Sequence, residues 1–215
     1  MLLWLTICIA ALLALACAWY LWVARSNRKK AFDALQWINL ALRSEGHVTG
    51  LQRVSASRFV VRLRMRSPIF RSASVLVEFV HREWPLRWLR ERRTGKLDAI
   101  TFQADLDCAP SFNFQVQNRR WFAGSRRRLP KDCSRWELTH AEPVVFATRK
   151  WQREISILVN ALLSSRQQEF LALSFRRKSP HFTATVPLDS VNPGGTSDPS
   201  VFTLLREIAA EASAL

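Results

Sequence analysis

The sequence predicts an α+β protein in which one N-terminal transmembrane helix is followed by a soluble domain with a mostly antiparallel sheet packed by helices. Three observations support this class: an uncharged apolar run at residues 2–24, several short runs in which apolar and polar residues alternate, and a final stretch with apolar residues at helical spacing. Alternation with a period of two is typical of half-buried strands, whereas spacings of three and four are typical of helices. A mixture of the two indicates an α+β domain.

The first element is expected to be a transmembrane helix at residues 2–24. The segment contains no charge, and as a helix it would reach about 34 Å, against a hydrocarbon core of about 30 Å. Trp4 lies near one end, and Trp19, Tyr20 and Trp22 lie near the other, where amphipathic rings favour the headgroup region. We therefore expect a single-pass anchor.

The charges that flank this segment predict its orientation. Only the amino terminus precedes it, whereas a basic group follows directly: Arg25, Arg28, Lys29 and Lys30. By the positive-inside rule, the N-terminus lies outside and the remaining chain lies in the cytoplasm, at the inner (plasma) membrane of a bacterium. A cleaved signal peptide fits less well, because no basic region precedes the run and the run is long. A lipoprotein signal ending at Cys17 also fits less well, since apolar residues continue past the cysteine.

Residues 25–46 are expected to form a juxtamembrane amphipathic helix. Phe32, Leu35, Ile38 and Leu42 follow the spacing of one helical face. This helix continues from the membrane span or bends just below it, and Gly46 ends the pattern. Residues 47–215 then make the cytoplasmic α+β domain.

Four alternating runs open this domain and predict a four-stranded antiparallel meander. In the first run apolar side chains alternate with arginines, and Pro68 then breaks the pattern. The runs are residues 58–66, 72–80, 99–106 and 112–122.

The second half of the chain is expected to combine a polar connection, two helices and two further strands. The connection is residues 125–135, and the stronger helical pattern is residues 148–165. Strands are expected at 169–176 and 181–188. The last helix begins at Ser200, with a buried stripe made by Val201, Leu204, Leu205 and Ile208.

The charge of the chain indicates the class of partner. The net charge is +15 and the isoelectric point is near 11.2, which favours phosphate-rich partners such as nucleic acid or anionic lipid. Two segments carry much of this charge: residues 81–96 hold six basic and two acidic residues, and residues 119–135 hold seven basic residues and one acid.

A lipid surface requires fewer assumptions than nucleic acid, because the predicted anchor already holds the domain at a bilayer. Each lysine or arginine near an anionic leaflet contributes about 1 kcal/mol. No helix-turn-helix, zinc finger or RNA-binding motif is visible in the sequence. The residues predicted to contact the membrane are Arg25, Arg28, Lys29, Lys30, Trp84, Arg87, Trp88, Arg90, Arg92, Arg93, Arg126, Arg127 and Arg128.

The segment at residues 81–96 is expected to be a strand end followed by a loop, because Pro85 argues against a continuous helix. Its simplest interpretation is a solvated hairpin tip, in which the tryptophans pack and the arginines face water. Membrane contact is the leading functional alternative.

No group of residues specifies a reaction. Phosphate-binding glycine motifs are missing, and the segment from His140 to Glu142 lacks the cysteines of a zinc deaminase. The four histidines lie in separate segments, so their spacing implies no metal site. Cys108 and Cys133 form no CxxC, and these two thiols are expected to be buried or idle. We therefore predict no catalytic, cofactor-binding or metal-binding residue.

The function expected from these features is a non-enzymatic binding or scaffolding domain held at the membrane, in contact with anionic lipid headgroups or a membrane protein partner. Two alternatives stay open. One is a membrane-tethered hydrolase that assembles Asp105, Asp107, His140 or His181 in a pocket. The other is a tethered nucleic-acid-binding protein.

Overall fold

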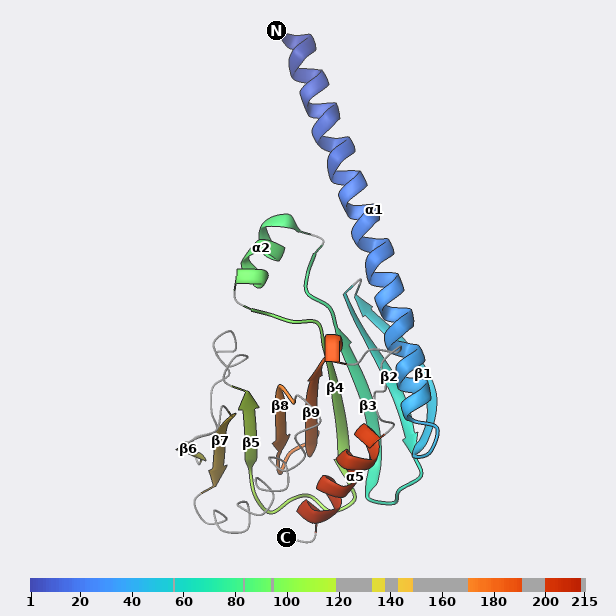
Figure 1. The fold of residues 1–215 in the computed structure, drawn as a ribbon, viewed down its shortest axis with the longest axis vertical. Coiled ribbons are helices and arrows are strands. Elements are labelled where there is room, and N and C mark those ends of the chain that lie inside the picture. Colours follow the sequence, from blue (N-terminus) through green and yellow to red (C-terminus); the bar gives the residue numbers. More distant parts are fainter. Residues whose placement is uncertain are drawn as a thin grey trace.

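A computed structural model describes residues 1–55, 57–82, 84–93, 95–118, 133–137, 143–148, 170–190 and 200–213. In this part of the chain, nine strands form one sheet in the order β1-β2-β3-β4-β9-β8-β5-β7-β6, and all the paired strands are antiparallel. Figure 1 shows the sheet with a long N-terminal helix that extends beyond it. The α+β class is therefore confirmed.

The strands of the sheet are β1 Gly46–Ser55, β2 Arg58–Met65, β3 Phe70–Glu78, β4 Ala99–Leu106, β5 Phe114–Asn118, β6 Cys133–Glu137, β7 Pro143–Thr148, β8 Ala172–Phe175 and β9 Phe182–Pro187. The helices are α1 Leu2–Ala41, α2 Pro85–Arg93, the short 3-10 helix η2 Leu188–Ser190, and α5 Ser200–Ser213.

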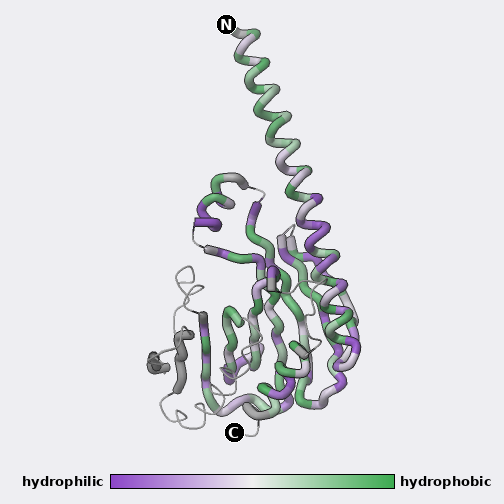
Figure 2. The backbone as a smooth tube through the Cα atoms, in the orientation of Figure 1, coloured by the Kyte–Doolittle hydropathy of each residue, from purple (hydrophilic) through white to green (hydrophobic). Residues whose placement is uncertain are grey.

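Helix α1 joins the apolar run and the amphipathic stretch into one helix of 40 residues. The first proline and the first glycine of the chain come later, at Pro68 and Gly46, so nothing in the sequence interrupts the helix. Its first half carries exposed apolar side chains, whereas buried residues begin at Val23 and continue through Trp37 and Ile38. Figure 2 shows this change from an apolar half to a mixed half that lies along the domain.

Gly46 ends the turn after α1 because the chain passes very close to β2 there. A Cβ atom at this position would lie 2.3 Å from the carbonyl oxygen of Arg64, a distance that backbone atoms cannot tolerate. The amide of Gly46 also donates to the carbonyl of Leu42 at 2.8 Å, which closes the turn that follows the helix.

The sheet has one apolar face, which is covered by α1 and α5 (Figure 1). Because strand residues alternate between faces, the paired positions of neighbouring strands gather similar side chains. The row through β2, β3 and β4 contains Val61, Val75 and Phe102, all buried. The other face carries polar cross-strand pairs such as Thr101 and Thr185, whose hydroxyls lie 3.1 Å apart.

Aromatic rings join the sheet to α5. The ring centroid of Phe102 lies 5.7 Å from that of Phe70, 6.0 Å from that of Phe182 and 5.7 Å from that of Phe202 on α5. Trp37 of α1 contacts Phe202 from the other side, with centroids 6.0 Å apart. Both helices thus share one hydrophobic core with the sheet.

A buried carboxylate connects the end of α1 to α5. Glu45 is only 6% exposed, and Arg206 of α5 donates to both of its oxygens at 2.9 and 3.0 Å. The hydroxyl of Thr203 donates to the same carboxylate at 3.1 Å. The C-terminal half of α1 is therefore part of the folded domain.

Several strand predictions are confirmed, but the predicted meander is wrong in its composition. The runs at 58–66, 72–80 and 99–106 became β2, β3 and β4, and the strands predicted at 169–176 and 181–188 became β8 and β9. The fourth strand of the observed meander is β1 rather than the run at 112–122. That run supplies β5, which pairs with β7 and β8 instead of β4.

Strands β1, β6 and β7 were not predicted. Strand β1 lacks apolar alternation because it lies at the edge of the sheet and most of its residues are exposed. The polar connection predicted at 125–135 is corrected at its end, because Cys133 begins β6. The helix predicted at 148–165 lies almost wholly outside the described residues, and Thr148 itself ends β7.

The final helix is confirmed. Helix α5 begins at Ser200, and Val201, Leu205 and Ile208 of the predicted stripe are buried, with Leu204 partly buried. Cys108 is a free, exposed cysteine, so of the two expected states, buried or idle, it is not buried.

Candidate functional site: a tryptophan pocket between α1 and α2

Helix α2 occupies the segment that was expected to be a loop. Pro85 is its first helical residue, a position where a proline has no hydrogen bond to lose and where its fixed φ suits the helix. Trp84 precedes it, and the amide of Trp88 donates to the carbonyl of Trp84 at 2.8 Å. The prediction of a strand end and loop, or of a hairpin tip, was therefore wrong, because proline disfavours the interior of a helix but not its first turn.

Gly95 ends α2 and turns the chain back toward it. Its φ is +68°, the left-handed conformation that glycine adopts at low cost. The Gly95 amide donates to the carbonyl of Arg92 at 3.1 Å, and the Lys96 amide donates to the carbonyl of Glu91 at 3.0 Å. These two bonds form a Schellman motif, which brings Lys96 beside Glu91.

The outward face of α2 combines apolar and basic side chains. Leu86 is 85% exposed and Leu89 is 44% exposed, and Trp84 just before the helix is 70% exposed. Arg90 and Arg93, which are also exposed, follow Leu86 and Leu89 at spacings of four. This surface of Trp84, Leu86, Leu89, Arg90 and Arg93 is called the outer face of α2 below.

The inward face of α2 is held by Glu91. Its carboxylate accepts from the amide of His81 at 2.9 Å and lies 3.4 Å from Lys96 Nζ and 3.3 Å from Arg87 Nε. Burial opposes ionisation of Glu91, but the His81 amide and the charge of Lys96 outweigh it and lower the pKa of Glu91 below its usual value. The ionised carboxylate thus ties α2 to the strand end that precedes it.

Asp98 is the buried anion that organises this end of the domain. It is 3% exposed, and one of its oxygens accepts from the amide of Val80 at 2.7 Å. The other oxygen lies 2.6 Å from Lys30 Nζ on α1 and 2.8 Å from a terminal nitrogen of Arg82. A buried carboxylate with three such donors is well satisfied, so α1, the end of β3 and the start of β4 are held together at one point.

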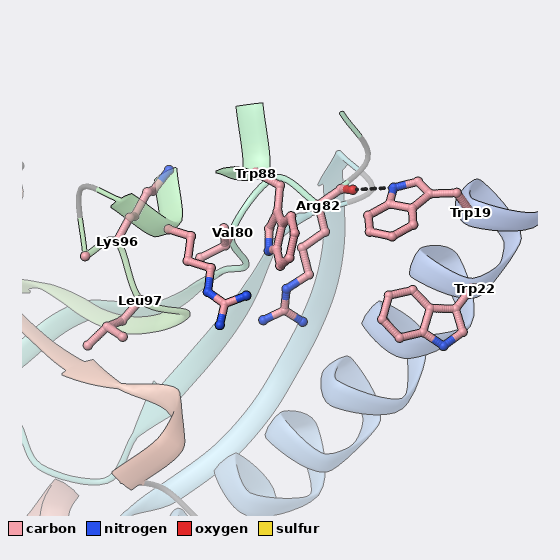
Figure 3. Close-up of a pocket in the computed structure, with 9 residues that line it drawn as sticks. Trp19, Trp22, Val80, Arg82, Trp88, Lys96 and Leu97 are labelled. Atoms are coloured by element: carbon pink, nitrogen blue, oxygen red, sulfur yellow. Dashed lines mark hydrogen bonds between the residues drawn. The ribbon is translucent and has the colours of Figure 1, made fainter. Parts of the chain in front are cut away.

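Trp19, which precedes Lys30 on α1, also connects this helix to the region around Asp98 and Arg82. Its indole nitrogen donates to the carbonyl oxygen of Arg82 at 3.1 Å, the contact drawn as a dashed line in Figure 3. Its ring also lies edge-on to Trp88 of α2, with centroids 6.0 Å apart, and 5.6 Å from that of Trp22. Tryptophans from two helices therefore meet around the main chain of Arg82.

A pocket of about 410 Å³ opens between these elements, and we call it the tryptophan pocket. Its walls are three tryptophans, three cationic side chains, two aliphatic residues and one glycine. The lining residues are Trp19, Trp22, Trp88, Arg82, Arg92, Lys96, Val80, Leu97 and Gly95. Figure 3 shows Trp19 and Trp22 on α1 facing Trp88 and Arg82 across the opening. A volume of this size and a mostly apolar lining with a few polar groups are typical of small-molecule sites.

Two of the three cations in this pocket are already paired with carboxylates. Arg82 contacts Asp98, and Lys96 lies at the longer distance of 3.4 Å from Glu91. Arg92 lies over the ring of Trp88, with its guanidinium carbon 5.4 Å from the ring centroid. In the described part of the chain, no carboxylate is paired with Arg92 and no acidic side chain lines the pocket.

The residues predicted to contact a membrane are placed in different environments. Arg25, Arg28 and Lys29 are exposed on α1, just beyond Trp22, whereas Lys30 is partly buried against Asp98. Of the α2 residues, Trp84, Arg90 and Arg93 lie on the outer face, Arg87 pairs with Glu91, and Trp88 and Arg92 turn toward the pocket. Arg126, Arg127 and Arg128 lie outside the described residues.

Of the residues in the predicted hydrolase alternative, Asp105 and His181 lie close enough together to interact. The Nδ1 atom of His181 accepts from the amide of Leu106 at 3.2 Å. The carboxylate of Asp105 accepts from the hydroxyl of Ser72 at 2.9 Å. Asp107 is exposed, and His140 lies outside the described residues. Asp105 and His181 are therefore engaged in local hydrogen bonds at the ends of β4 and β9.

The hydroxyl of Ser179 lowers the pKa of Asp105 below its usual value; burial opposes this, and Ser72 and His181 lower it further. Within the described ranges, no group of three or more metal-ligating side chains comes together.

Sequence reasoning did not identify Asp98, Glu91 or Lys96 as parts of the site. A single acid that directly precedes an alternating strand, within a strongly basic region, was the available signal for Asp98. Trp19 and Trp22 were recognised as an aromatic belt, but their contacts with a segment more than sixty positions away could not be read from spacing.

By length and composition, α1 is able to cross a membrane, and it lies near the N-terminus of the chain. No protein-family model matches the sequence, and a comparison with curated proteins finds no match.

Proposed function

We propose that this protein is a single-pass membrane protein whose α+β domain is held at the cytoplasmic face of a bacterial inner membrane and docks on anionic lipid through α2. Its role is binding or scaffolding at that surface rather than catalysis. The observation that carries the proposal is the contact between Trp19 and Trp88, with ring centroids 6.0 Å apart. This contact fixes α2 beside α1 at the point where the exposed apolar half of α1 ends.

The depth of α2 follows from the position of Trp19 on α1. If the apolar residues that precede Trp19 lie in hydrocarbon, Trp19 and Trp22 lie in the interfacial layer, which tryptophan favours. A helix packed against Trp19 then lies at the same depth. The exposed side chains of Leu86 and Leu89 gain a non-aqueous environment there, worth up to about 1.5–3 kcal/mol for a fully buried leucine.

Electrostatic attraction favours the same arrangement. Arg90 and Arg93 on the outer face, and Arg25, Arg28 and Lys29 on α1, are all exposed at this end of the domain. Each contributes about 1 kcal/mol near an anionic leaflet. Arg87 contributes less, because Glu91 neutralises part of its charge. The combination of exposed leucines with exposed arginines is typical of interfacial helices.

The orientation can be tested with paired topology reporters on the full chain. A reporter fused after Leu215 is expected to be active in the cytoplasm, because the basic residues Arg25 to Lys30 follow the span. A variant in which Arg25, Arg28 and Lys29 become glutamine is expected to show mixed orientation. Activity of the parent fusion only outside the cytoplasm would refute the topology.

Docking can be tested by amide hydrogen exchange of the full-length protein in nanodiscs. We expect the amides of α2 to exchange more slowly in discs with anionic lipid than in zwitterionic discs. The double variant Arg90→Ala/Arg93→Ala should lose this difference. The double variant Arg64→Ala/Arg71→Ala removes two exposed arginines at the other end of the strands and should keep it. Equal exchange in both lipids for the parent protein would contradict lipid docking.

A further inference from the structure

We propose that the tryptophan pocket binds the phosphate group of an anionic phospholipid, with Arg92 as the principal phosphate ligand. This inference rests on the proposed function, since it places the pocket at the depth of lipid headgroups. It adds a discrete site, with one lipid held inside the pocket, to the general attraction of the outer face.

The polar part of the pocket is cationic without an acidic counterpart. Arg92, Arg82 and Lys96 line it, and within the described residues none of the lining side chains is acidic. Asp98 and Glu91 satisfy Arg82 and Lys96, but each of these anions is shared among several donors. An entering phosphate would therefore meet an excess of positive charge.

Arg92 is arranged to take such a ligand. Its guanidinium lies over the ring of Trp88, which restricts its orientation without neutralising its charge. Trp88 is itself restrained, because Trp19 packs edge-on against it. Arg92 is exposed and therefore accessible to a ligand, and a guanidinium restrained by an aromatic ring can donate two parallel hydrogen bonds to a phosphate.

The remaining walls match the apolar part of a lipid. Trp19 and Trp22 come from the end of the apolar half of α1, and Val80 and Leu97 complete the aliphatic lining. Figure 3 shows the two α1 indoles on one side of the opening and Arg82 and Lys96 beyond them. A ligand with a charged head and an apolar tail can contact both parts at once, whereas inorganic phosphate uses only the cations.

The volume is consistent with a headgroup rather than a whole lipid. About 410 Å³ lies at the lower end of the range of small-molecule sites, roughly 300–1,000 Å³. The phosphate and the neighbouring glycerol region fit such a space, and the acyl chains then continue along α1 into the bilayer.

The test is native mass spectrometry of the full-length protein in mild detergent, with a phosphatidylglycerol, a phosphatidylcholine of the same chains, and inorganic phosphate as separate ligands. We expect the first phosphatidylglycerol molecule to bind at least tenfold more tightly than the first phosphatidylcholine molecule. Inorganic phosphate should compete only weakly with phosphatidylglycerol. Arg92→Gln should weaken binding of the first phosphatidylglycerol molecule at least tenfold, because a charge-assisted hydrogen bond to the phosphate is lost. Arg71→Gln, a change at an exposed arginine at the opposite end of β3 from the pocket, should change it less than twofold.

Three results would overturn the proposal. Equal losses in the two variants would mean that phosphatidylglycerol responds to overall charge and not to the pocket. Equal affinity for the two lipids would remove the preference for an anionic headgroup. Displacement of phosphatidylglycerol by an equal concentration of inorganic phosphate would identify a free-phosphate site instead.

These outcomes are separate from those of the docking experiment. Binding of one lipid in detergent does not require α2 to lie on a bilayer, so the pocket can fail while the exchange difference in nanodiscs is kept. Conversely, the variant Arg90→Ala/Arg93→Ala keeps Arg92, so its effect on exchange in nanodiscs reports on the outer face of α2 and not on the pocket. Far-UV circular dichroism of Arg92→Gln checks that α2 and the sheet remain folded.

Discussion

Replacement of Asp98 by asparagine should weaken the attachment of α1 to the sheet. The carboxylate is 3% exposed and pairs with Lys30 at 2.6 Å and Arg82 at 2.8 Å. Asparagine has nearly the same shape and its amide oxygen can still accept from the Val80 amide. Its amide nitrogen, however, is a donor and replaces the oxygen that accepts from Lys30 and Arg82, so the change removes the charge and both of these hydrogen bonds.

The expected loss of unfolding free energy depends on how well water can solvate Lys30 and Arg82 once Asp98 has lost its charge. Breaking a fully buried ion pair costs about 3–5 kcal/mol. The side chains of Lys30 and Arg82 are 31% and 22% exposed, so water can recover part of their solvation. We therefore expect Asp98→Asn to lower the free energy of unfolding by about 2–3 kcal/mol, below that range. Asp98→Ala also leaves the Val80 amide without an acceptor, which adds about 1–3 kcal/mol.

The assay is urea unfolding of the full-length protein in detergent micelles, followed by far-UV circular dichroism. Asp107→Asn is the matched control, because Asp107 is exposed at the other end of β4, and it should change the free energy of unfolding by less than about 0.5 kcal/mol. In the Asp98→Asn background, Lys30→Met should cost less than it does in the parent, because its partner is already lost. A loss below about 0.5 kcal/mol for both Asp98 variants would refute the assignment of Asp98 as the organising anion.

Three further changes test neighbouring parts of the structure. Glu91 has a pKa below the usual value of 4.5, so its contribution to stability is present above that pH and is lost as the pH falls through the lower pKa of the folded protein. The difference in unfolding free energy between the parent and Glu91→Gln should therefore be constant near neutral pH and vanish in acid. Urea unfolding at several pH values measures it. Arg206→Ala should cost about 3 kcal/mol in the same assay, because it leaves the carboxylate of Glu45, 6% exposed, without its charged partner; a loss equal to that of an exposed arginine would contradict this. Trp19→Phe keeps an aromatic ring but loses the hydrogen bond to the Arg82 carbonyl, so it should cost about 0.5–1.5 kcal/mol and speed hydrogen exchange in α2; unchanged exchange would mean that Trp19 does not restrain α2.

The parts of the fold that sequence could predict are those with strong periodicity. Val61 and Leu63 are buried, and the arginines that alternate with them are exposed, so the pattern of β2 directly reflects its two faces. The uninterrupted apolar run also predicted the first half of α1. In both cases each residue's environment follows from its neighbours along the chain.

The order of the strands could not be predicted in the same way. Strand β9 lies between β4 and β8 because Phe182 and Ala184 complete the apolar face, and nothing local in the sequence indicates that neighbour. Edge strand β1 has too few buried residues to produce alternation.

The site was only partly predictable for a similar reason. The basic and aromatic character of residues 81–96 was visible, and the membrane hypothesis came from it. The division of α2 into an outer face and a pocket face depends on tertiary contacts: Glu91 with the His81 amide, and Trp88 with Trp19. Those contacts determine that Arg92 lines the pocket whereas Arg93 does not.

The most direct test of lipid docking is photo-crosslinking from the outer face of α2. A diazirine-bearing amino acid placed at position 86, the most exposed apolar residue of α2, should form covalent adducts with lipid when the full-length protein is in anionic nanodiscs. The same diazirine-bearing amino acid in place of Arg64, which is exposed at the opposite end of the strands from Asp98, should react with water and give no lipid adduct. Lipid adducts at both positions, or at neither, would contradict the proposal that α2 rests on the membrane surface.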